Sequence, residues 1–192
     1  MRPDDLLNAM HVAERLKDTP RHCWTSGGRR EDVAEHSWRM TLMAYFVSDE
    51  FPEADMEKIY KMCLIHDLGE CFTGDIPVFM KKESDEAKKE ELLYRWVDTL
   101  PEPFRTEMRA LYDEMAARQT LEARIYKAMD SLEAVIQHNE SDISTWEPHE
   151  YELNRTYAYD RVAFSDYMKE LRAAIRQETE TKIAGSEQKP LA

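Results

Sequence analysis

Four potential metal ligands lie in or beside apolar segments with helical spacing: His36, the adjacent pair His66 and Asp67, and Asp130. A polar group on a core face is costly unless it is paired, hydrogen-bonded or bound to a metal ion. For a single buried histidine, an ordinary hydrogen-bonded core position is the commoner explanation. The contiguous pair His66-Asp67 is harder to explain in that way, because two neighbouring polar groups both need partners and one shared ion satisfies both.

The geometry of a helical fold allows these four side chains to share one ion. Adjacent residues on a helix point about 100° apart, and at a helix end both side chains can turn onto the same ion. His36 and Asp130 would then come from neighbouring helices, as in many metal sites of helical bundles. Two imidazoles and two carboxylates suit Mn²⁺, Co²⁺, Fe²⁺ or Zn²⁺ better than an all-oxygen or thiolate site does. A six-coordinate ion would keep two positions for water and a substrate oxygen, which is the arrangement of a metal-dependent hydrolase.

The rest of the sequence predicts the helices that must position these ligands. Only 5 glycines and 8 prolines interrupt a chain rich in helix formers, which favours a mostly helical fold. No strand pattern, internal repeat or domain linker is evident, so we expect an all-α, single-domain helical bundle. Apolar periodicity places helices at about 4–17, 33–49, 55–66, 83–98, 103–117, 120–138 and 160–182.

The segments between these helices are expected to be irregular. Residues 18–30 read as a loop with its turn at Ser26-Gly27-Gly28, and residues 139–157 lack a periodic pattern. The mixed charge run at 81–90 is typical of a solvated helix face or a mobile loop. Residues 184–192 are expected to form a flexible tail.

Composition limits the classes of partner. With 42% hydrophobic and 34% charged residues among 192, the chain has the profile of a soluble globular protein. A formal net charge of −13 disfavours a nucleic-acid polymer, whose phosphates need a basic surface. No apolar stretch is long enough for a membrane span, and the acidic N-terminus does not resemble a signal peptide. Three cysteines without a C-x-x-C pattern suggest reduced thiols in a cytoplasmic protein.

The predicted ligands and their neighbours resemble a known family. The order His36…His66-Asp67…Asp130 matches the H…HD…D signature of the HD-domain phosphohydrolase superfamily. Four longer words resemble its 5′-deoxynucleotidase branch: Asp32-Val33-Ala34-Glu35-His36-Ser37-Trp38, His66-Asp67-Leu68-Gly69-Glu70, Thr73-Gly74-Asp75-Ile76-Pro77 and Ala128-Met129-Asp130-Ser131-Leu132-Glu133-Ala134. The resemblance covers roughly residues 5–175 and implies an HD domain over residues 1–183.

This resemblance implies a function and assigns roles to the site residues. It implies one divalent ion held by His36, His66, Asp67 and Asp130, hydrolysis of deoxyribonucleoside 5′-monophosphates to deoxynucleoside and phosphate, and a homodimer. By the same resemblance, Glu70 activates water or protonates the leaving 5′ oxygen. Asp75 is a second acidic residue beside the phosphate.

The residues themselves allow these roles without requiring them. Glu70 lies four residues after His66 and stays near the ion if the helix continues that far, where a carboxyl can act as general acid or base. Its alternative is a surface charge at a helix end. Asp75 stands in Gly-Asp-Ile-Pro, which is also a good turn sequence. For Glu133, three residues after Asp130, a supporting structural role is favoured over a direct one.

A phosphorylated substrate also needs cationic partners. The segment Pro20-Arg21-His22-Cys23-Trp24 offers Arg21 for a phosphate and Trp24 for stacking on a base or sugar. It resembles the family's substrate segment before the first metal histidine. Arg29 or Arg30 could share or take the phosphate role, because loop lengths differ among relatives.

Two alternatives keep the fold and change the function. A cyclic-nucleotide phosphodiesterase or dNTP triphosphohydrolase would act on another nucleotide. Two-metal phosphodiesterases, however, need more histidines between the HD pair and the last aspartate, and none lies between His66 and Asp130. A non-catalytic metal-binding regulatory domain would not need the intact Glu70 and Asp75.

Overall fold

α-Helices build most of the computed structural model, which describes residues 1–77 and 79–187. The prediction of an all-α fold is confirmed. The helices are α1 Pro3–Ala13, α2 Val33–Phe46, α3 Met56–Ile65, α4 Glu70–Thr73, α5 Glu83–Val97, α6 Phe104–Ala117, α7 Leu121–Glu140, α8 Glu150–Thr156, α9 Tyr159–Val162 and α10 Asp166–Glu187. Three short 3₁₀ turns, Glu14–Asp18, Ser48–Glu50 and Ile143–Thr145, lie between them.

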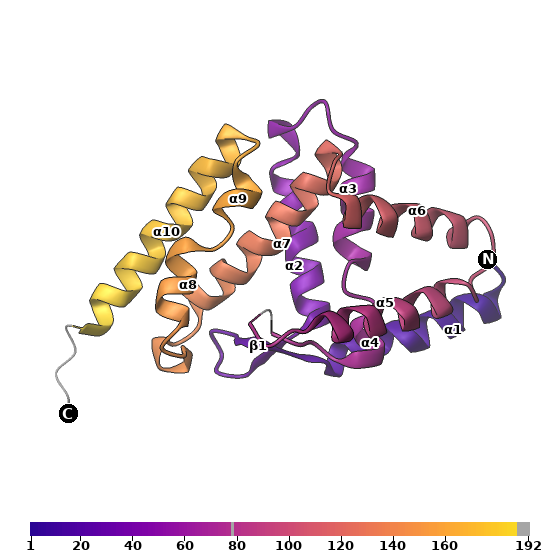
Figure 1. Cartoon of the computed structure of the whole chain (residues 1–192), viewed down its shortest axis with the longest axis horizontal. Coiled ribbons are helices and arrows are strands. Elements are labelled where there is room, and N and C mark those ends of the chain that lie inside the picture. Colours follow the sequence, from indigo (N-terminus) through magenta and orange to yellow (C-terminus); the bar gives the residue numbers. More distant parts are fainter. Residues whose placement is uncertain (78, 188–192) are drawn as a thin grey trace.

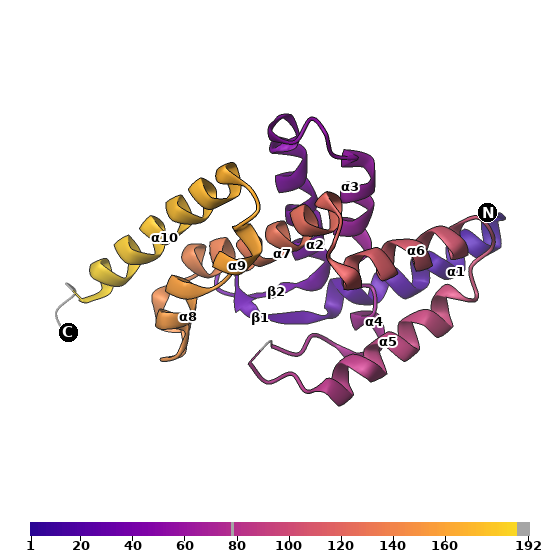
Figure 2. The same cartoon turned by 45° about the horizontal axis from the view of Figure 1, so that its top comes forward.

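The long helix α7 is the axis of the fold. It packs against α2 and α3 on one side and against α9 and α10 on another, and α6 covers part of its N-terminal half. Figures 1 and 2 show α8, α9 and α10 on one flank of α7, and α1, α5 and α6 on the opposite side of the molecule. Ten residues of α7 are buried, so this helix is surrounded by core and can carry polar groups into the interior.

The segment expected to be a loop at 18–30 is instead an antiparallel hairpin. Strands β1 (Pro20–Trp24) and β2 (Arg30–Asp32) pair with each other and pack against α7 and α2 respectively. Three to five residues are too few for strand periodicity to be read from sequence. The predicted turn is confirmed: Gly28 has φ +82°, and its N–H bonds the carbonyl of Thr25 at 3.0 Å.

The C-terminal third contains more helix than expected. The segment 139–157 holds α8, and the final helix begins at Asp166 rather than near residue 160. That helix continues through residues 184–187, which were expected to belong to the flexible tail; residues 188–192 lie outside the described residues. Among the described helices, none combines the length and apolar character that crossing a membrane requires.

Candidate metal centre

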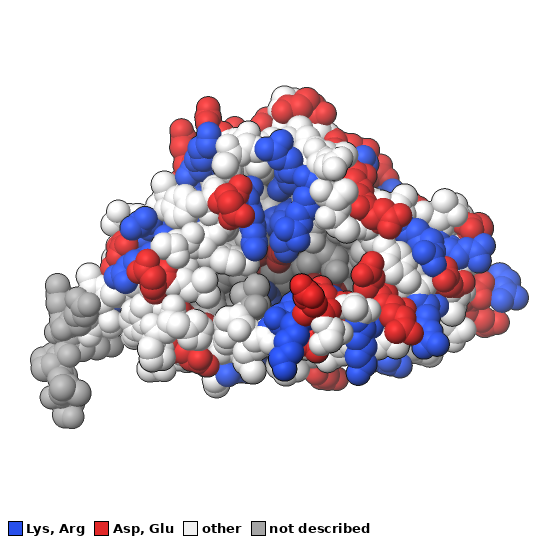
Figure 3. Space-filling model, viewed as in Figure 1, with Lys and Arg blue, Asp and Glu red and all other residues white. Residues whose placement is uncertain are grey.

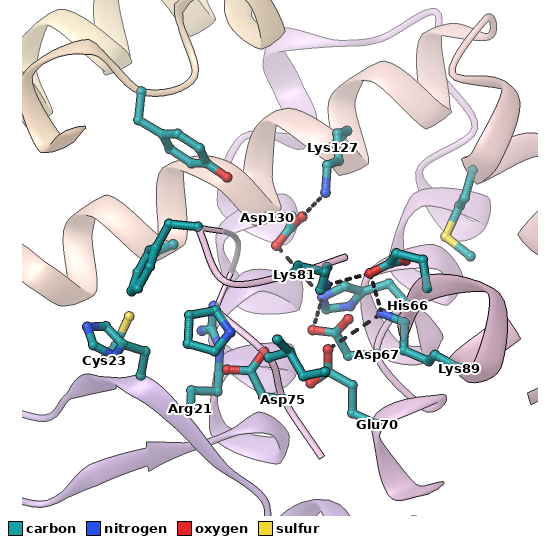
Figure 4. Close-up of a pocket in the computed structure, with 18 of the residues that line it drawn as sticks. Arg21, Cys23, His66, Asp67, Glu70, Asp75, Lys81, Lys89, Lys127 and Asp130 are labelled. Carbon is teal, nitrogen blue, oxygen red and sulfur yellow. Dashed lines mark hydrogen bonds and ion pairs between the residues drawn. The ribbon is translucent and has the colours of Figure 1, made fainter. Parts of the chain in front are cut away.

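The four predicted ligands lie on α2, just after α3 and on α7, where these three helices pack together. His36 lies on the second turn of α2, His66 and Asp67 directly follow α3, and Asp130 lies midway along α7. The contacts of α3 with both α2 and α7 bring these segments together. Figure 4 shows His66, Asp67 and Asp130 turned toward one another.

The ligand atoms crowd around one point. The two imidazole Nε2 atoms of His36 and His66 lie 3.3 Å apart. His66 Nε2 is 2.9 Å from Asp67 Oδ2, and Asp130 Oδ1 lies 3.3 Å from His36 Nε2 and 3.9 Å from His66 Nε2. His36, His66 and Asp67 each offer an atom within 4.8 Å of the others. Donors around a single Zn²⁺-sized ion would be separated by about 3.0–3.4 Å, so the donor set fits a divalent cation.

The Nδ1 atoms of both histidines make contacts that turn their Nε2 atoms toward the ligand cluster. His66 Nδ1 donates to the carbonyl of Cys63 at 2.9 Å, and His36 Nδ1 contacts the buried carboxylate of Glu133. Metal-binding histidines usually bond their other ring nitrogen in this way, which fixes the ring and leaves Nε2 as ligand. The contact of Glu133 with His36 Nδ1 is compatible with the supporting role that the sequence favoured.

The charges of the cluster depend on one another. Burial opposes a charged His36, but Glu133 and Asp130 outweigh it and raise the pKa of His36 to about 9. Burial acts to raise the pKa of Asp130, but Lys127 and His36 hold it well below its usual range. Without an ion, a proton on His36 thus compensates part of the negative charge, and a bound cation would take over that role.

A cavity of about 640 Å³ opens beside the ligands. His66, Asp67 and Asp130 line it, whereas His36 lies fully buried behind them. Figure 3 shows a hollow near the middle of this face, bordered above and below by Lys or Arg side chains. Despite the net charge of −13, the cavity wall includes the cations Arg21, Lys81, Lys89, Arg118, Lys127 and Arg161.

Both predicted catalytic carboxyls line this cavity. Glu70 begins the one-turn helix α4 and is 4% exposed. Its Oε1 lies 3.6 Å from Lys89 Nζ, and its Oε2 has no hydrogen-bond partner among the described residues. Burial, with the nearby carboxylates of Asp67 and Asp75, raises the pKa of Glu70 to about 9. In the metal-free protein Glu70 therefore holds a proton more tightly than an ordinary glutamate does.

Gly69 makes room for the lysine that meets Glu70. A Cβ at Gly69 would lie 2.8 Å from Lys89 Cγ and 3.2 Å from its Cδ. The Lys89 stem therefore lies against the glycine, and its ammonium reaches Glu70 (Figure 4). The charge run at 81–90 is thus not wholly solvated, because Lys89 points into the site.

Arg21 lies inside the cavity, and the other predicted substrate residues do not. Arg21 Nη1 is 2.7 Å from Glu31 Oε2 and 3.4 Å from Glu133 Oε2. Both ion pairs use the same nitrogen. Trp24, Arg29 and Arg30 are absent from the described cavity wall. The Arg30 guanidinium stacks on the Trp24 ring at 4.4 Å, and Arg29 pairs with Glu35 at the surface.

Sequence reasoning missed several residues at this end of the cavity. Lys127 pairs with Asp130 from one turn earlier on α7, a spacing of three residues that could have indicated the contact. Glu31 is 2% exposed and binds Arg21. Lys89 gave no local signal, because its neighbours in sequence are the surface charges of α5.

Comparison with known proteins places the chain among metal-dependent hydrolases. A family model described as "HD domain" matches residues 13–172. The 5′-deoxynucleotidase HDDC2 of Homo sapiens is 30% identical over 139 residues, which are 70% of this chain and 67% of the relative. The protein of the same name from Danio rerio is 30% identical over 141 residues, 71% of this chain and 70% of the relative.

Solved structures agree in fold. A predicted metal-dependent phosphohydrolase from Magnetospirillum magnetotacticum superposes with a TM-score of 0.76 at 27% identity, covering 94% of this chain and 96% of the other. A conserved hypothetical protein from Pyrococcus furiosus gives a TM-score of 0.65 at 29% identity, covering 91% and 99%.

Proposed function

Because the chain belongs to the HD domain family, in its 5′-deoxynucleotidase branch, we propose that it hydrolyses deoxyribonucleoside 5′-monophosphates to deoxynucleoside and phosphate. The observation that carries this proposal is the convergence of two imidazole Nε2 atoms and two carboxylates beside a cation-lined cavity. The names of the relatives supply the substrate class.

One divalent ion would be held by His36, His66, Asp67 and Asp130. When bound, such an ion polarises a phosphoryl oxygen and lowers the pKa of water. The mixed nitrogen and oxygen donors favour Mn²⁺, Co²⁺, Fe²⁺ or Zn²⁺. Glu133 keeps His36 in the correct orientation for this role.

Glu70 would act on the leaving group. Without a metal ion, burial and the nearby carboxylates of Asp67 and Asp75 raise its pKa to about 9, and a carboxyl that retains its proton suits a general acid that protonates the departing 5′ oxygen. Lys89 beside it fixes the position of the carboxyl. Asp75, on the same wall of the cavity, would accept a hydrogen bond from the attacking water.

Arg21 would bind the phosphate. Its Nη1 is anchored by Glu31 and Glu133, which leaves the other edge of the guanidinium for phosphoryl oxygens, a geometry suited to arginine. Lys89 and Lys127 add positive charge at this end of the cavity. We do not assign Trp24 to the substrate. Its ring stacks on Arg30 and would stabilise the hairpin instead.

A substrate panel tests the proposed reaction. Protein loaded with Mn²⁺ or Co²⁺ should release phosphate from deoxyribonucleoside 5′-monophosphates, and much less from ribonucleotides, 3′-monophosphates, triphosphates or cyclic nucleotides. Failure to release phosphate from any monophosphate, with the metal demonstrably bound, would refute the proposal. Preferential cleavage of cyclic nucleotides or triphosphates would favour another HD-type phosphohydrolase.

We further propose that the protein is a cytoplasmic homodimer. Trp38, Leu42 and Tyr45 are 64%, 37% and 59% exposed and share one face of α2 through their i, i+4 and i+7 spacing. An apolar stripe of this kind suits a self-complementary interface. All three cysteines are buried and free, as expected in a reducing compartment. Sedimentation of the wild type and of Trp38→Glu should give dimer and monomer respectively.

A further inference from the structure

A second group of polar side chains lies in the same cavity, away from the metal ligands. His22 and Cys23 come from β1, His138 from α7, and Glu150 and Asn154 from α8, and all five line the cavity. His22 Nε2 is 3.0 Å and His138 Nε2 is 3.4 Å from Glu150 Oε1. Cys23 Sγ lies 3.4 Å from His138 Nε2. Neither the motif nor the proposed chemistry accounts for this group.

Two members of the group are buried and hold polar atoms that lack a well-formed hydrogen bond. Glu150 is 1% exposed and Asn154 is 2% exposed. Glu150 Oε2 accepts the backbone N–H of Glu147 at 2.7 Å. Its Oε1 is approached by the two imidazoles but forms no aligned hydrogen bond among the described residues, and Asn154 Nδ2 has no hydrogen-bond partner there. Leaving such buried groups unpaired is unfavourable. Their spacing of four residues puts both on the cavity face of α8, so a ligand can satisfy them together.

The distance from the metal centre suits one nucleotide. Asp130, Ala134 and His138 all line the cavity at successive intervals of four residues along α7, which places His138 about 12 Å along the helix from Asp130. On β1, Arg21 and Cys23 share a face about 7 Å apart. Figure 4 shows Arg21 between Cys23 and the metal ligands. A phosphate held at Arg21 therefore leaves the far end of the cavity to the other end of the same molecule.

The arrangement at this far end favours neither an anion nor a metal ion as its ligand. A carboxylate repels phosphate, and the described groups able to hold an ion are His36–His66–Asp67 and Glu31–His36–Glu133, neither of which includes Glu150. An acceptor and an amide beside aromatic surface are what a planar base needs. Phe79 supplies that surface: it lines the cavity, and its ring lies 5.2 Å from that of His22.

We propose that Glu150 and Asn154 form the nucleobase subsite of this enzyme and select bases that carry an N–H or amino group next to an acceptor. Glu150 Oε1 accepts from the N–H or amino group, and the Asn154 amide pairs with the neighbouring atom of the base. His22 and His138 confine the Glu150 carboxylate, and Phe79 covers the base. This subsite rests on the proposed nucleotidase function, since it assigns the base end of the same substrate.

The test compares two purine deoxynucleoside 5′-monophosphates. Guanine carries a ring N–H and an amino group on its pairing edge, whereas unsubstituted purine carries neither. The ratio of kcat/KM for the guanine nucleotide to kcat/KM for the purine nucleotide should be roughly 10 to 100 in the wild type, because the unsubstituted purine ring offers no hydrogen-bond donor to Glu150.

The decisive variant is Glu150→Gln. Its carbonyl can keep the bond from the Glu147 N–H, which turns an amide donor toward the cavity in place of the acceptor, so the ratio should fall to about 1 or below. Asn154→Leu, which removes the amide at similar volume, should lower the same ratio and serves if the first variant does not fold. Glu152→Gln makes the same chemical change on the exposed face of α8 and should leave both the ratio and the rates unchanged.

The outcomes separate this inference from the proposed function. Equal hydrolysis of both nucleotides by the wild type, or an unchanged ratio in both Glu150→Gln and Asn154→Leu, overturns the base subsite while the phosphomonoesterase stands. Hydrolysis of other deoxyribonucleoside 5′-monophosphates but of neither of these two also overturns the base subsite alone, whereas hydrolysis of no monophosphate overturns both proposals.

Discussion

The two ends of the cavity contain the same kinds of residue and differ in how those residues meet. At the metal end, the Nε2 atoms of His36 and His66 and the carboxylates of Asp67 and Asp130 all point toward one position. At the far end, His138 and His22 approach the Glu150 carboxylate from either side without forming an ion-sized group. Convergence of lone pairs, rather than composition, distinguishes a metal centre from a hydrogen-bonding subsite.

The pKa values of His36 and His138, one from each end of the cavity, show the same contrast. Burial disfavours the charged form of both. At His36, Glu133 and Asp130 outweigh burial and raise the pKa to about 9. At His138 burial dominates over Glu150, and the pKa falls to about 4. The metal end is therefore built for positive charge, whereas the far end keeps a neutral imidazole at physiological pH.

Removing a carboxylate ligand should have the largest effect and should act on the metal end alone. Asp67→Ala is expected to lose bound metal and to reduce phosphate release to background, since the buried histidines cannot hold the ion without it. Metal analysis and turnover on the same sample check this. The matched control is Asp160→Ala at an exposed position, which should behave as wild type. Full turnover in Asp67→Ala contradicts the ligand assignment.

Weakening the support of a ligand should have a smaller effect. Glu133→Gln removes the negative charge that orients His36, and metal affinity is expected to fall by about 10- to 100-fold. Titration of metal-free protein with Zn²⁺ measures the change. Glu140→Gln alters a half-exposed carboxylate on the same helix that pairs with Arg39 and should bind metal normally. Equal affinity in both variants would remove Glu133 from the centre.

The contrast between the histidines predicts how metal affinity depends on pH. The ion needs unprotonated Nε2 of His36, whose pKa is about 9 in the metal-free protein. Below about pH 9, affinity should therefore rise about tenfold per pH unit, and close to one proton should be released on binding at pH 7. Calorimetry in buffers of different ionisation enthalpy measures the released protons. An affinity that does not change between about pH 6 and 8, with no proton release, is the contrary result.

The smallest effect is expected at the glycine beside Glu70. Gly69→Ala places a methyl group against the Lys89 stem and should lower kcat by a few-fold, because displacing Lys89 shifts the carboxyl that it contacts. Metal content should not change. Gly27→Ala adds a methyl group that meets only Thr25 Oγ1 at 3.6 Å and should be neutral. Identical kcat values for both variants would show that Lys89 does not position Glu70.

Most residues of the metal end could be predicted from the sequence, whereas few residues of the far end could. The sequence indicated four metal ligands because polar side chains in apolar helices require partners, and because the flanking residues match motifs of the family. These ligands are His36, His66, Asp67 and Asp130. The hairpin was missed because β1 and β2 are too short for strand periodicity.

Lys89, Glu150 and Asn154 were missed for a different reason. Their local sequence resembles a charge run or an irregular segment, and only the packing of α5 and α8 brings them to the cavity. Burial of these groups is a tertiary property that no local pattern reports. The residues proposed to contact the base were therefore harder to predict than those proposed to bind the metal.

The most direct test of the account is an anomalous difference map from crystals grown with Mn²⁺ or Zn²⁺. The account predicts one peak per chain, about 2.0–2.3 Å from the Nε2 atoms of His36 and His66 and from carboxylate oxygens of Asp67 and Asp130. A peak at the neighbouring group of Glu31, His36 and Glu133, or beside Glu150, would contradict it.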